Sequence, residues 1–363
     1  MSVVAARGLE SLAFELTRLE SGELEALVTA GGRLGLDVVT GPDWAILSGP
    51  RARLSALARP WVVPEALTGV AIALGHALPA EEPRTWHTAA GPIRLEGPVI
   101  MGILNATPDS FSDGARYQDP AAAADRAGEL VAGGASIIDI GGESTRPGSA
   151  RVSPQEELDR VLPVVEAVVG RVPGVFVSID TTRATVARAA LDRGAVIVND
   201  VSGLRADPAI GPLCAERGAG LVLMHSRGEP GNLAADRPAD YPEGVLAACV
   251  AELGQARERA RLAGVPEENV VVDPGLGFGK TADQSVELLR GIGALRALGR
   301  PILIGPSRKR FLGALTGRPV EQRDAATAGA CALGWLAGAA IFRVHQPGPV
   351  RDALAVAAAL EPR

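Results

Sequence analysis

The chain has 363 residues, of which 47% are hydrophobic and 21% charged, and this balance is typical of globular proteins rather than disordered ones. Its net charge is -6 and it has no basic run, which argues against nucleic acid as the main partner, because phosphate contacts need clustered Lys and Arg. The sequence also lacks an apolar stretch of about 18 residues and a basic start followed by an apolar core. We therefore expect a cytoplasmic protein with no membrane partner.

Residues 1–81 are predicted to form a small α+β domain of unknown role. We expect a helix near residues 9–30, strands at 36–40 and 44–48, and helices near 51–58 and 64–78. Residues 79–83 have linker composition, and residues 87–96 are predicted to form a hairpin at the bottom of the next domain. His76 and His87 are isolated in this part of the chain, and we assign them no role.

Residues 82–363 show a regular alternation of apolar runs and helical patterns. The apolar runs lie at 99–105, 136–142, 175–180, 196–200, 221–225, 270–275, 301–307 and 340–345. The helical patterns between them include 120–132, 154–169, 182–193, 244–263, 285–297 and 323–337. Continuous apolar strands that alternate with helices indicate a parallel sheet covered on both faces. Eight such units predict a (β/α)8 TIM barrel, an α/β fold, and a doubly wound open sheet is the alternative.

Two kinds of rare residue lead to further expectations. The chain has only two lysines, Lys280 and Lys309, and we expect them where a compact ammonium group serves function better than a guanidinium. Cys214, Cys249 and Cys331 lack the spacing of a redox or zinc motif, so we expect reduced, buried thiols.

Polar residues stand at the carboxyl end of nearly every predicted strand, which is where a barrel of this kind carries its active site. They are Asn105, the run from Glu143 to Arg146, Asp180, Asn199 with Asp200, Asp273, the run from Ser307 to Lys309, and Arg343 with His345. Since side chains alternate along a strand, Asp200 is expected to point toward the helices and to be structural. The others are predicted to converge on one polar pocket.

The residue types in this pocket indicate the class of ligand. Asp180, Asn199 and Asp273 offer hydrogen-bond acceptors and Lys309 offers donors, so the expected ligand is a flat heterocycle with donors and acceptors on its edge. Cationic residues suited to an anion are also present, namely Arg146, Arg343 and His345, and Asn105 could hold a hard metal ion through its carbonyl oxygen. Together these features suggest a heterocycle that carries a phosphate group.

Seven ordered motifs between about residues 98 and 345 resemble those of the dihydropteroate synthase family. They are NATPDSFSDG at 105–114, GASIIDIGGESTRP at 134–147, SID at 178–180, NDVSG at 199–203, DPGLGFGK at 273–280, SRK at 307–309 and RVH at 343–345. Two departures are Ala115, where the first loop usually continues with Gly or Ser, and His225-Ser226-Arg227, where Met-Gln usually follows His. The first is expected to stiffen the loop, and the second is expected to be tolerated at a pocket edge.

The resemblance implies the condensation of 6-hydroxymethyl-7,8-dihydropterin diphosphate with 4-aminobenzoate, assisted by Mg2+, in an enzyme that is a homodimer. It implies that Asp180, Asn199, Met224, Asp273, Phe278 and Lys309 bind the pterin. It implies that Asn105, Arg146, Arg343 and His345 bind the diphosphate, with Asn105 also on the metal. It implies that Phe111, Thr145, Pro147, Phe278 and Ser307 bind 4-aminobenzoate. The catalytic residues would be Asn105, Arg146, Asp180, Lys309, Arg343 and His345.

Two other functions remain open on the sequence. One is a related pterin-binding barrel that transfers a methyl group from methyltetrahydrofolate; Arg146, Arg343 and His345 argue against it, because that reaction has no diphosphate to bind. The other is a paralogue that binds pterin without catalysis, and the complete first and second loops argue against it.

Overall fold

The computed structural model describes residues 2–7, 12–49, 51–58, 63–77, 83, 85–106, 119–143, 152–228 and 239–360. The chain divides into two compact units. One consists of Met1–Glu82, Tyr241–Gln255 and Gly293–Gly299, and the other of Pro83–Asp240, Ala256–Ile292 and Arg300–Arg363. Within the described residues, none of the helices combines the length and the apolar character needed to cross a lipid bilayer.

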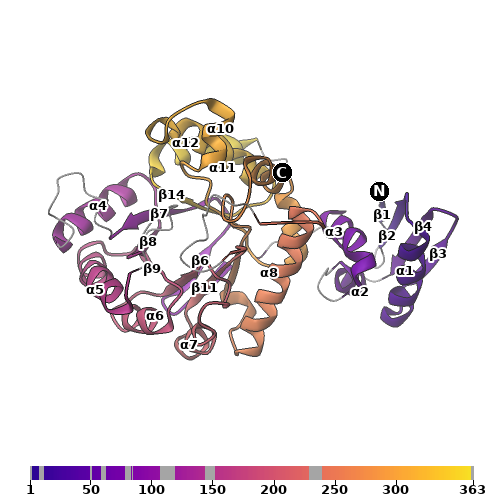
Figure 1. The fold of residues 1–363 in the computed structure, drawn as a ribbon, viewed down its shortest axis with the longest axis horizontal. Helices are drawn as coiled ribbons and strands as arrows, with labels where there is room; N and C mark the ends of the chain where they lie inside the picture. The colour runs from indigo at the N-terminus through magenta and orange to yellow at the C-terminus, as the bar shows by residue number, and fades with distance from the viewer. Residues whose placement is uncertain are drawn as a thin grey trace. The chain divides into compact units, whose positions relative to one another are not determined.

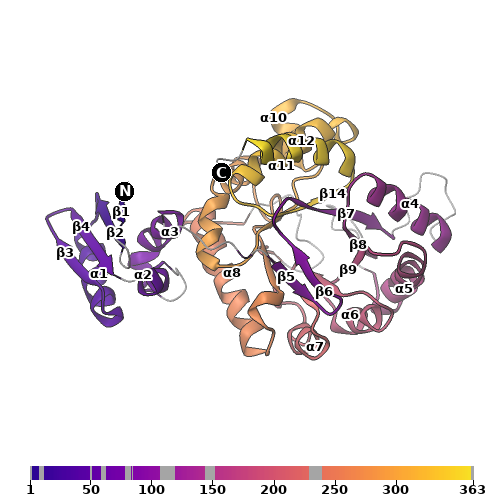
Figure 2. The ribbon, with the colours of Figure 1, turned by 180° about the vertical axis from the view of Figure 1, so that it is seen from behind.

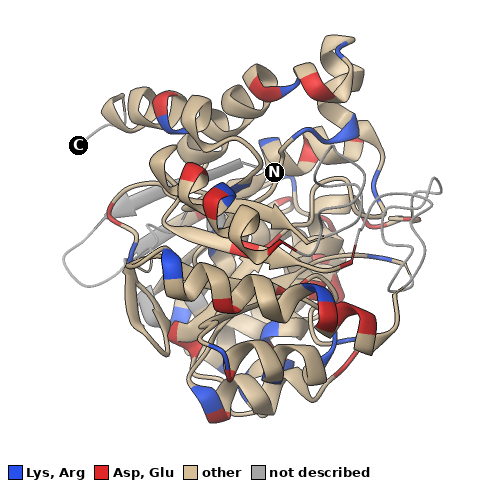
Figure 3. Cartoon of the chain, turned by 90° about the vertical axis from the view of Figure 1, so that its left-hand side faces the viewer, with Lys and Arg blue, Asp and Glu red and all other residues tan. Residues whose placement is uncertain are grey.

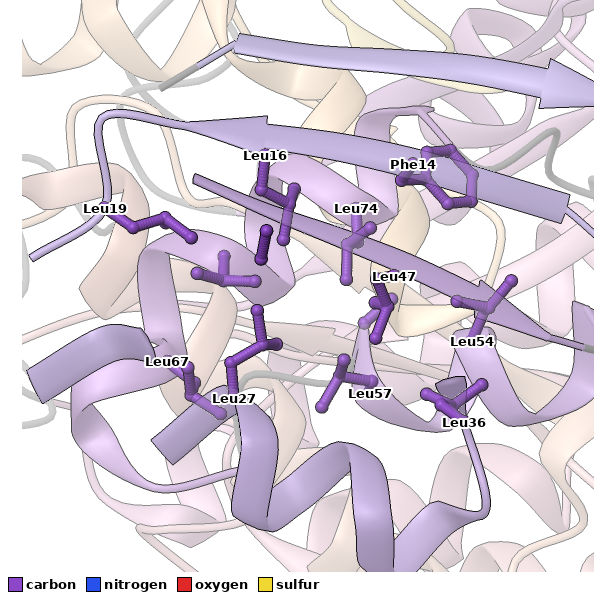
Figure 4. Packing of buried hydrophobic residues seen from close by; sticks show 13 residues of the cluster. Phe14, Leu16, Leu19, Leu27, Leu36, Leu47, Leu54, Leu57, Leu67 and Leu74 are labelled. Atoms are coloured by element: carbon purple, nitrogen blue, oxygen red, sulfur yellow. The ribbon is translucent and has the colours of Figure 1, made fainter. Parts of the chain in front are cut away.

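The first unit contains an antiparallel sheet in the order β1-β2-β4-β3. Its strands are β1 (Ser2–Arg7), β2 (Leu12–Thr17), β4 (Trp44–Gly49) and β3 (Asp37–Thr40), and its helical segments are α1 (Ser21–Leu34), α2 (Arg51–Leu57), η1 (Glu65–Leu67) and α3 (Thr68–Ala77). Figure 4 shows Phe14, Leu16 and Leu47 from the sheet packed with leucines from the helices, among them Leu27 and Leu57. Burial of this apolar surface is what holds the small domain together.

The helix predicted near residues 9–30 is wrong over its first half, because residues 12–17 form β2. In β2, Phe14 and Leu16 are buried while Glu15 between them is exposed, which is the period of a strand with one covered face. The helix itself begins later, at Ser21, where Glu20 and Glu23 form a capping box. The strands predicted at 36–40 and 44–48 and the helices near 51–58 and 64–78 are confirmed.

The second unit contains the predicted barrel (Figure 1). Its strands are β7 (Val99–Asn105), β8 (Ile137–Gly141), β9 (Phe176–Asp180), β10 (Ile197–Asp200), β11 (Gly220–Met224), β12 (Val270–Asp273), β13 (Leu303–Ile304) and β14 (Ile341–Val344). They pair in parallel in the order β12-β11-β10-β9-β8-β7-β14-β13. A parallel bridge between Val272 and Ile302 joins the two ends of this order, so the sheet closes and the open-sheet alternative is wrong.

Helices alternate with these strands along the chain. They are α4 (Pro120–Ala132), α5 (Pro154–Arg171), α6 (Ala184–Leu191), α7 (Ile210–Arg217), α8 (Val245–Leu262), α9 (Ala282–Arg290), α10 (Arg310–Thr316), α11 (Asp324–Leu336) and α12 (Pro347–Ala359), with the short helices η3 (Glu267–Asn269), η4 (Ile292–Leu298) and η5 (Val320–Gln322). The first two barrel helices start at side-chain caps, since Asp119 accepts from Ala121 N and Ser153 from Glu156 N. Basic and acidic side chains are interspersed on the helices in Figure 3.

A hairpin of β5 (Thr85–Thr88) and β6 (Gly91–Arg94) lies in front of the barrel strands in Figure 2. Its Trp86 is fully buried against residues from the amino-terminal halves of the strands, such as Met101 and Ile197, and donates to Asn269 O at 2.8 Å. The hairpin therefore covers the bottom of the barrel, as predicted, and the opposite end carries the polar residues.

Candidate active site

The strand register places several predicted site residues at one level of the barrel. Asn105 pairs with Gly141, Gly141 with Asp180, and Asp180 with Asn199 across four neighbouring strands. All of these positions lie at the carboxyl ends of their strands, where parallel strands deliver their side chains to a common mouth. Met224 and Asp273 pair in the same way at the ends of β11 and β12.

Arg343, on β14, lies between two carboxylates. Its Nε donates to Asp139 Oδ2 at 2.6 Å and its Nη2 donates to Asp180 Oδ2 at 2.7 Å. Burial opposes the charge on the guanidinium, but the two carboxylates outweigh it and raise the pKa of Arg343. Asp180 and Arg343 were predicted at the same mouth, and the structure joins them directly.

Asp139 is a residue of this network that the sequence analysis did not single out. Its carboxylate is fully buried and accepts from Ser178 Oγ at 2.6 Å, from Asn199 Nδ2 at 3.0 Å and from Arg343 Nε. A carboxylate in the middle of an apolar strand is itself a signal, because burying a charge is unfavourable unless it is paired. Asp139 lies in the middle of its strand, whereas the predicted site residues were those at the strand ends.

The environment of Asp180 makes its proton available near neutral pH. Burial raises the pKa of this carboxyl to about 7 against the opposing charge of Arg343, and the charge of Asp139 adds to the rise.

Asp200 has a different role, as expected, because both of its oxygens accept from the backbone, at Ser202 N and Leu204 N. It stabilises the turn that follows β10.

Asp273 and Lys309 form the other polar part of the site. Asp273 is buried, and its Oδ1 accepts from Gly275 N at 2.7 Å. Burial raises the pKa of Asp273, and the nearby charge of Lys309 opposes the rise. Burial likewise lowers the pKa of Lys309 to about 7, and Asp273 opposes that change. Each group thus depends on the other to stay charged.

Apolar side chains surround these charges. Met224 and Val201 are buried and pack with Phe278, and Lys309 Nζ lies 4.1 Å from the centre of the Phe278 ring. This is a cation–π contact, and Lys309 also donates to Leu276 O. The site thus combines polar groups for orientation with apolar side chains, which is typical of sites for small heterocycles.

Ser307 and His345 are brought together, although the sequence analysis assigned them to different ligands. Ser307 Oγ lies 2.9 Å from His345 Nδ1 and accepts from His345 N at 3.1 Å. Ser307 Oγ can donate its own proton to Nδ1, and a neutral imidazole that accepts this bond carries its ring proton on Nε2. The pair thus orients a nitrogen donor of His345.

Lys280, the second lysine, supports the loop that follows β12 instead of entering the pocket. Its Nζ lies 2.9 Å from His225 Nδ1 and donates to Gly275 O at 3.0 Å and to Phe278 O at 2.9 Å. Gly275 has a φ of +63°, and a Cβ there would collide with His225 O, so only glycine fits this close approach. The loop that carries Asp273 and Phe278 is held to the end of β11 in this way.

Ser226 and Arg227, which depart from the family pattern after β11, also donate hydrogen bonds to backbone carbonyl groups. Ser226 Oγ donates to Val201 O at 2.9 Å and accepts from Arg205 Nη2 at 2.9 Å, and Arg227 donates to Asp240 O. Cys214, Cys249 and Cys331 are buried, as expected.

Part of the predicted site falls outside the described residues, namely Phe111, Thr145, Arg146, Pro147 and Ala115. Glu143, the last described residue before the second of these gaps, pairs with Arg183 at 3.0 Å. Within the described ranges no group of three or more His, Cys, Asp or Glu side chains is placed to hold a metal. The amide oxygen of Asn105 suits Mg2+, which often takes few protein ligands and the phosphates of its substrate.

Comparison with known proteins agrees with this geometry. Residues 101–345 match the family described as "Pterin binding enzyme". The dihydropteroate synthase of Mycobacterium leprae (strain TN) is 49% identical over 268 residues, which are 72% of this chain and 92% of that protein.

Two solved structures are similar in fold as well as in sequence. The Xanthomonas albilineans dihydropteroate synthase with 4-aminobenzoic acid is 40% identical, with a TM-score of 0.70, and the match covers 77% of this chain and all of that one (100%). The Burkholderia cenocepacia dihydropteroate synthase complexed with 7,8-dihydropteroate is 40% identical, with a TM-score of 0.68, and the match covers 77% of this chain and 96% of that one.

Proposed function

The chain belongs to the pterin binding enzyme family, and we propose on this basis the reaction that its residues perform. It is a dihydropteroate synthase: it condenses 6-hydroxymethyl-7,8-dihydropterin diphosphate with 4-aminobenzoate to 7,8-dihydropteroate and diphosphate in folate biosynthesis. The observation that carries the assignment is the presence of buried Asp273 and of Lys309, whose charges act on each other, near the Arg343–Asp180 ion pair at one mouth of the barrel.

In our proposal the pterin ring binds between these charges. Asp273 and Asn199 accept from the amino-pyrimidine edge, Asp180 binds the reduced side of the ring, and Lys309 donates to the ring carbonyl and a nearby nitrogen. Met224 and Phe278 pack against the ring. Support comes from the burial of Asp273 and from the desolvation that lowers the pKa of Lys309, since a ligand that pairs with both groups relieves this unfavourable desolvation.

The diphosphate is assigned to Asn105, Arg146, Arg343 and His345. The Nε2 proton of His345 would donate to a phosphate oxygen, and Arg343 would use the part of its guanidinium that does not face Asp139 and Asp180. Asn105 would hold Mg2+, which supplies positive charge to the leaving diphosphate when it is bound.

The 4-aminobenzoate site is assigned to Phe111, Thr145, Pro147, Phe278 and Ser307. Of these, Phe278 and Ser307 are described, and Ser307 precedes the amino-terminal end of α10, where a carboxylate is favoured. The amine of 4-aminobenzoate attacks the methylene carbon of the pterin as the bond to diphosphate breaks. No strong general base is needed, because the lone pair of an arylamine is already free, and charge stabilisation of the leaving group is the main requirement.

We further propose a homodimer formed through α11 and α12. Leu333 and Leu336 of α11, Val356 of α12 and Leu360, which follows α12, are at least half exposed. These helices pack against each other (Figure 1), and exposed apolar side chains on adjacent helices are typical of association surfaces. Small alanine and glycine residues among them permit the close approach of a second copy. The cytoplasm stays the predicted location of the protein.

The two-domain division at residues 1–81 and 82–363 also remains a proposal, with all candidate site residues in the second part.

The test of the function is release of diphosphate when the protein is mixed with the pterin diphosphate, Mg2+ and 4-aminobenzoate. Release that requires 4-aminobenzoate is expected. A folded protein that binds pterin without release would be a non-catalytic paralogue, and methyl transfer from methyltetrahydrofolate would indicate the other alternative.

A further inference from the structure

Asp139 connects three strands of the barrel and has no part in the reaction proposed above. Its fully buried carboxylate accepts from Ser178 of β9, Asn199 of β10 and Arg343 of β14. One oxygen, Oδ2, receives both Asn199 Nδ2 and Arg343 Nε, while the other receives Ser178 Oγ. Two of its three partners, Asn199 and Arg343, are assigned to substrate binding. Asp139 is therefore placed to control how these two side chains face the substrate.

We propose that Asp139 is a positioning residue that sets the hydrogen-bond polarity of the pterin pocket. It holds the Asn199 side chain with its amide nitrogen inward and its carbonyl oxygen toward the ligand, and it holds Arg343 against Asp180. This inference rests on the proposed function, because it takes the pterin edge as the group that Asn199 meets.

The orientation of Asn199 follows from the donor and acceptor inventory. An arginine can only donate, so the Asp139 oxygen that receives Arg343 Nε is an acceptor. The Asn199 atom that faces the same oxygen at 3.0 Å must therefore be the donor Nδ2. A flipped amide would place two acceptor oxygens against each other in a buried site, which is unfavourable. Asn199 Oδ1 then lies on the other side of the amide group.

A pocket with this polarity discriminates between ring systems. Asn199 Oδ1 and the carboxylate of Asp273, whose Oδ1 already receives Gly275 N, offer acceptors to the ligand. They suit a ring edge rich in N–H donors, as in a 2-amino-4-oxo pterin. A lumazine, which has a carbonyl oxygen in place of the 2-amino group, would bring an acceptor against acceptors. Asp139 would thus contribute to specificity without touching the substrate.

The experiment compares the binding of 6-hydroxymethylpterin and 6-hydroxymethyllumazine to the full chain by calorimetric titration. In Asp139→Leu and Asp139→Ala no acceptor remains, so Asn199 is free to flip, and the preference for pterin over lumazine should fall about tenfold or more. In Asp139→Asn the preference should be kept within about threefold, because the new amide can turn its oxygen to Arg343 and Asn199 and its nitrogen to Ser178.

Ser178→Ala is the matched control, since it removes one neutral partner of Asp139 and leaves the other two, and it should keep the preference. Equal losses for both ligands in a folded apolar variant would overturn the proposal. The proposal would also be overturned if neither apolar variant folded, because Asp139 would then be required for the stability of the barrel and not for the polarity of the pocket. Binding preference needs no turnover, so failure of the proposed function is read separately, from diphosphate release by the unsubstituted protein.

Discussion

Arg343 Nη2 lies 2.7 Å from Asp180 Oδ2, and this ion pair joins a residue assigned to the diphosphate with one assigned to the pterin ring. Each side chain is largely buried, with 20% and 16% of its surface exposed. The two side chains are paired before any ligand binds. A substitution that alters binding of the diphosphate can therefore also alter binding of the pterin ring. The first prediction separates these two roles.

Replacing His345 with Ala should weaken binding of the pterin diphosphate about ten- to hundredfold, because one charge-assisted hydrogen bond is worth roughly 1.5 to 3 kcal/mol. Binding of 6-hydroxymethylpterin, which lacks the diphosphate, should barely change. Arg343→Ala should lower diphosphate binding too, and in addition destabilise the fold by about 3 to 5 kcal/mol, since Asp139 and Asp180 lose their partner. Titration of both ligands with thermal melts tests this, and equal losses for the two ligands would remove the anion assignment.

Asp273→Asn should lower pterin affinity by about ten- to hundredfold while the fold survives. The asparagine oxygen can still accept from Gly275 N, but its NH2 group then faces the ligand donors and Lys309. Calorimetric titration of pterin is the measurement. Asp200→Asn is the control with the opposite profile, because Asp200 serves two backbone donors: it should lower the melting temperature and leave pterin affinity intact. Unchanged affinity in Asp273→Asn would take Asp273 out of the site.

Asp180 and Lys309 both change the free energy of unfolding of the ligand-free protein with pH. Their joint contribution should make the protein least stable near neutral pH. The pKa of Asp180 is raised from 3.8 to about 7, so the fold binds more protons than the unfolded chain in that window, and stability falls as pH rises. The pKa of Lys309 is lowered from 10.5 to about 7, so the unfolded chain binds more protons there, and stability rises with pH above 7.

Chemical unfolding at a series of pH values checks these two slopes. Asp180→Asn should remove the decline between about pH 4 and 7, and Lys309→Met should remove the rise above pH 7, each relative to the unsubstituted protein. If a variant follows the same pH dependence as the parent, the substituted group is not the one that titrates.

If the protein is the proposed homodimer, Leu336→Glu should convert it to a monomer, because a charge within an apolar interface is unfavourable when it remains unpaired. Leu262→Glu, at a more exposed leucine on α8, is the control outside the proposed interface and should leave the association state unchanged. Sedimentation of both variants and the parent gives the answer. A parent that sediments as a monomer would rule out the interface.

A chain that starts at Glu82 should fold and retain diphosphate release. All candidate site residues come after this point, and the cluster at the bottom of the barrel begins with Trp86. A thermal melt and a turnover assay on the shortened chain test the prediction. Should that chain be folded but inactive, residues before 82 contribute to the site and the proposed domain boundary is misplaced.

The sequence was sufficient for the barrel because each strand buries both faces, and such strands appear as short apolar runs such as 99–105 and 196–200. It was insufficient for β2, where leucine, alanine and glutamate favour a helix locally. Pairing with β1 and β4 outweighs that preference, and pairing is a property of distant residues.

For the site, the residues that stand at the strand ends are predictable from the sequence, since a polar residue after an apolar run is directly visible there. Their pairing depends on the folded barrel. Asp139 and Arg343 are 204 residues apart in the chain, and Ser307 and His345 are 38 apart, so neither contact has a local signal. A buried carboxylate acquires its role when folding closes the barrel and brings donors from several strands to it, because desolvation makes those partners obligatory.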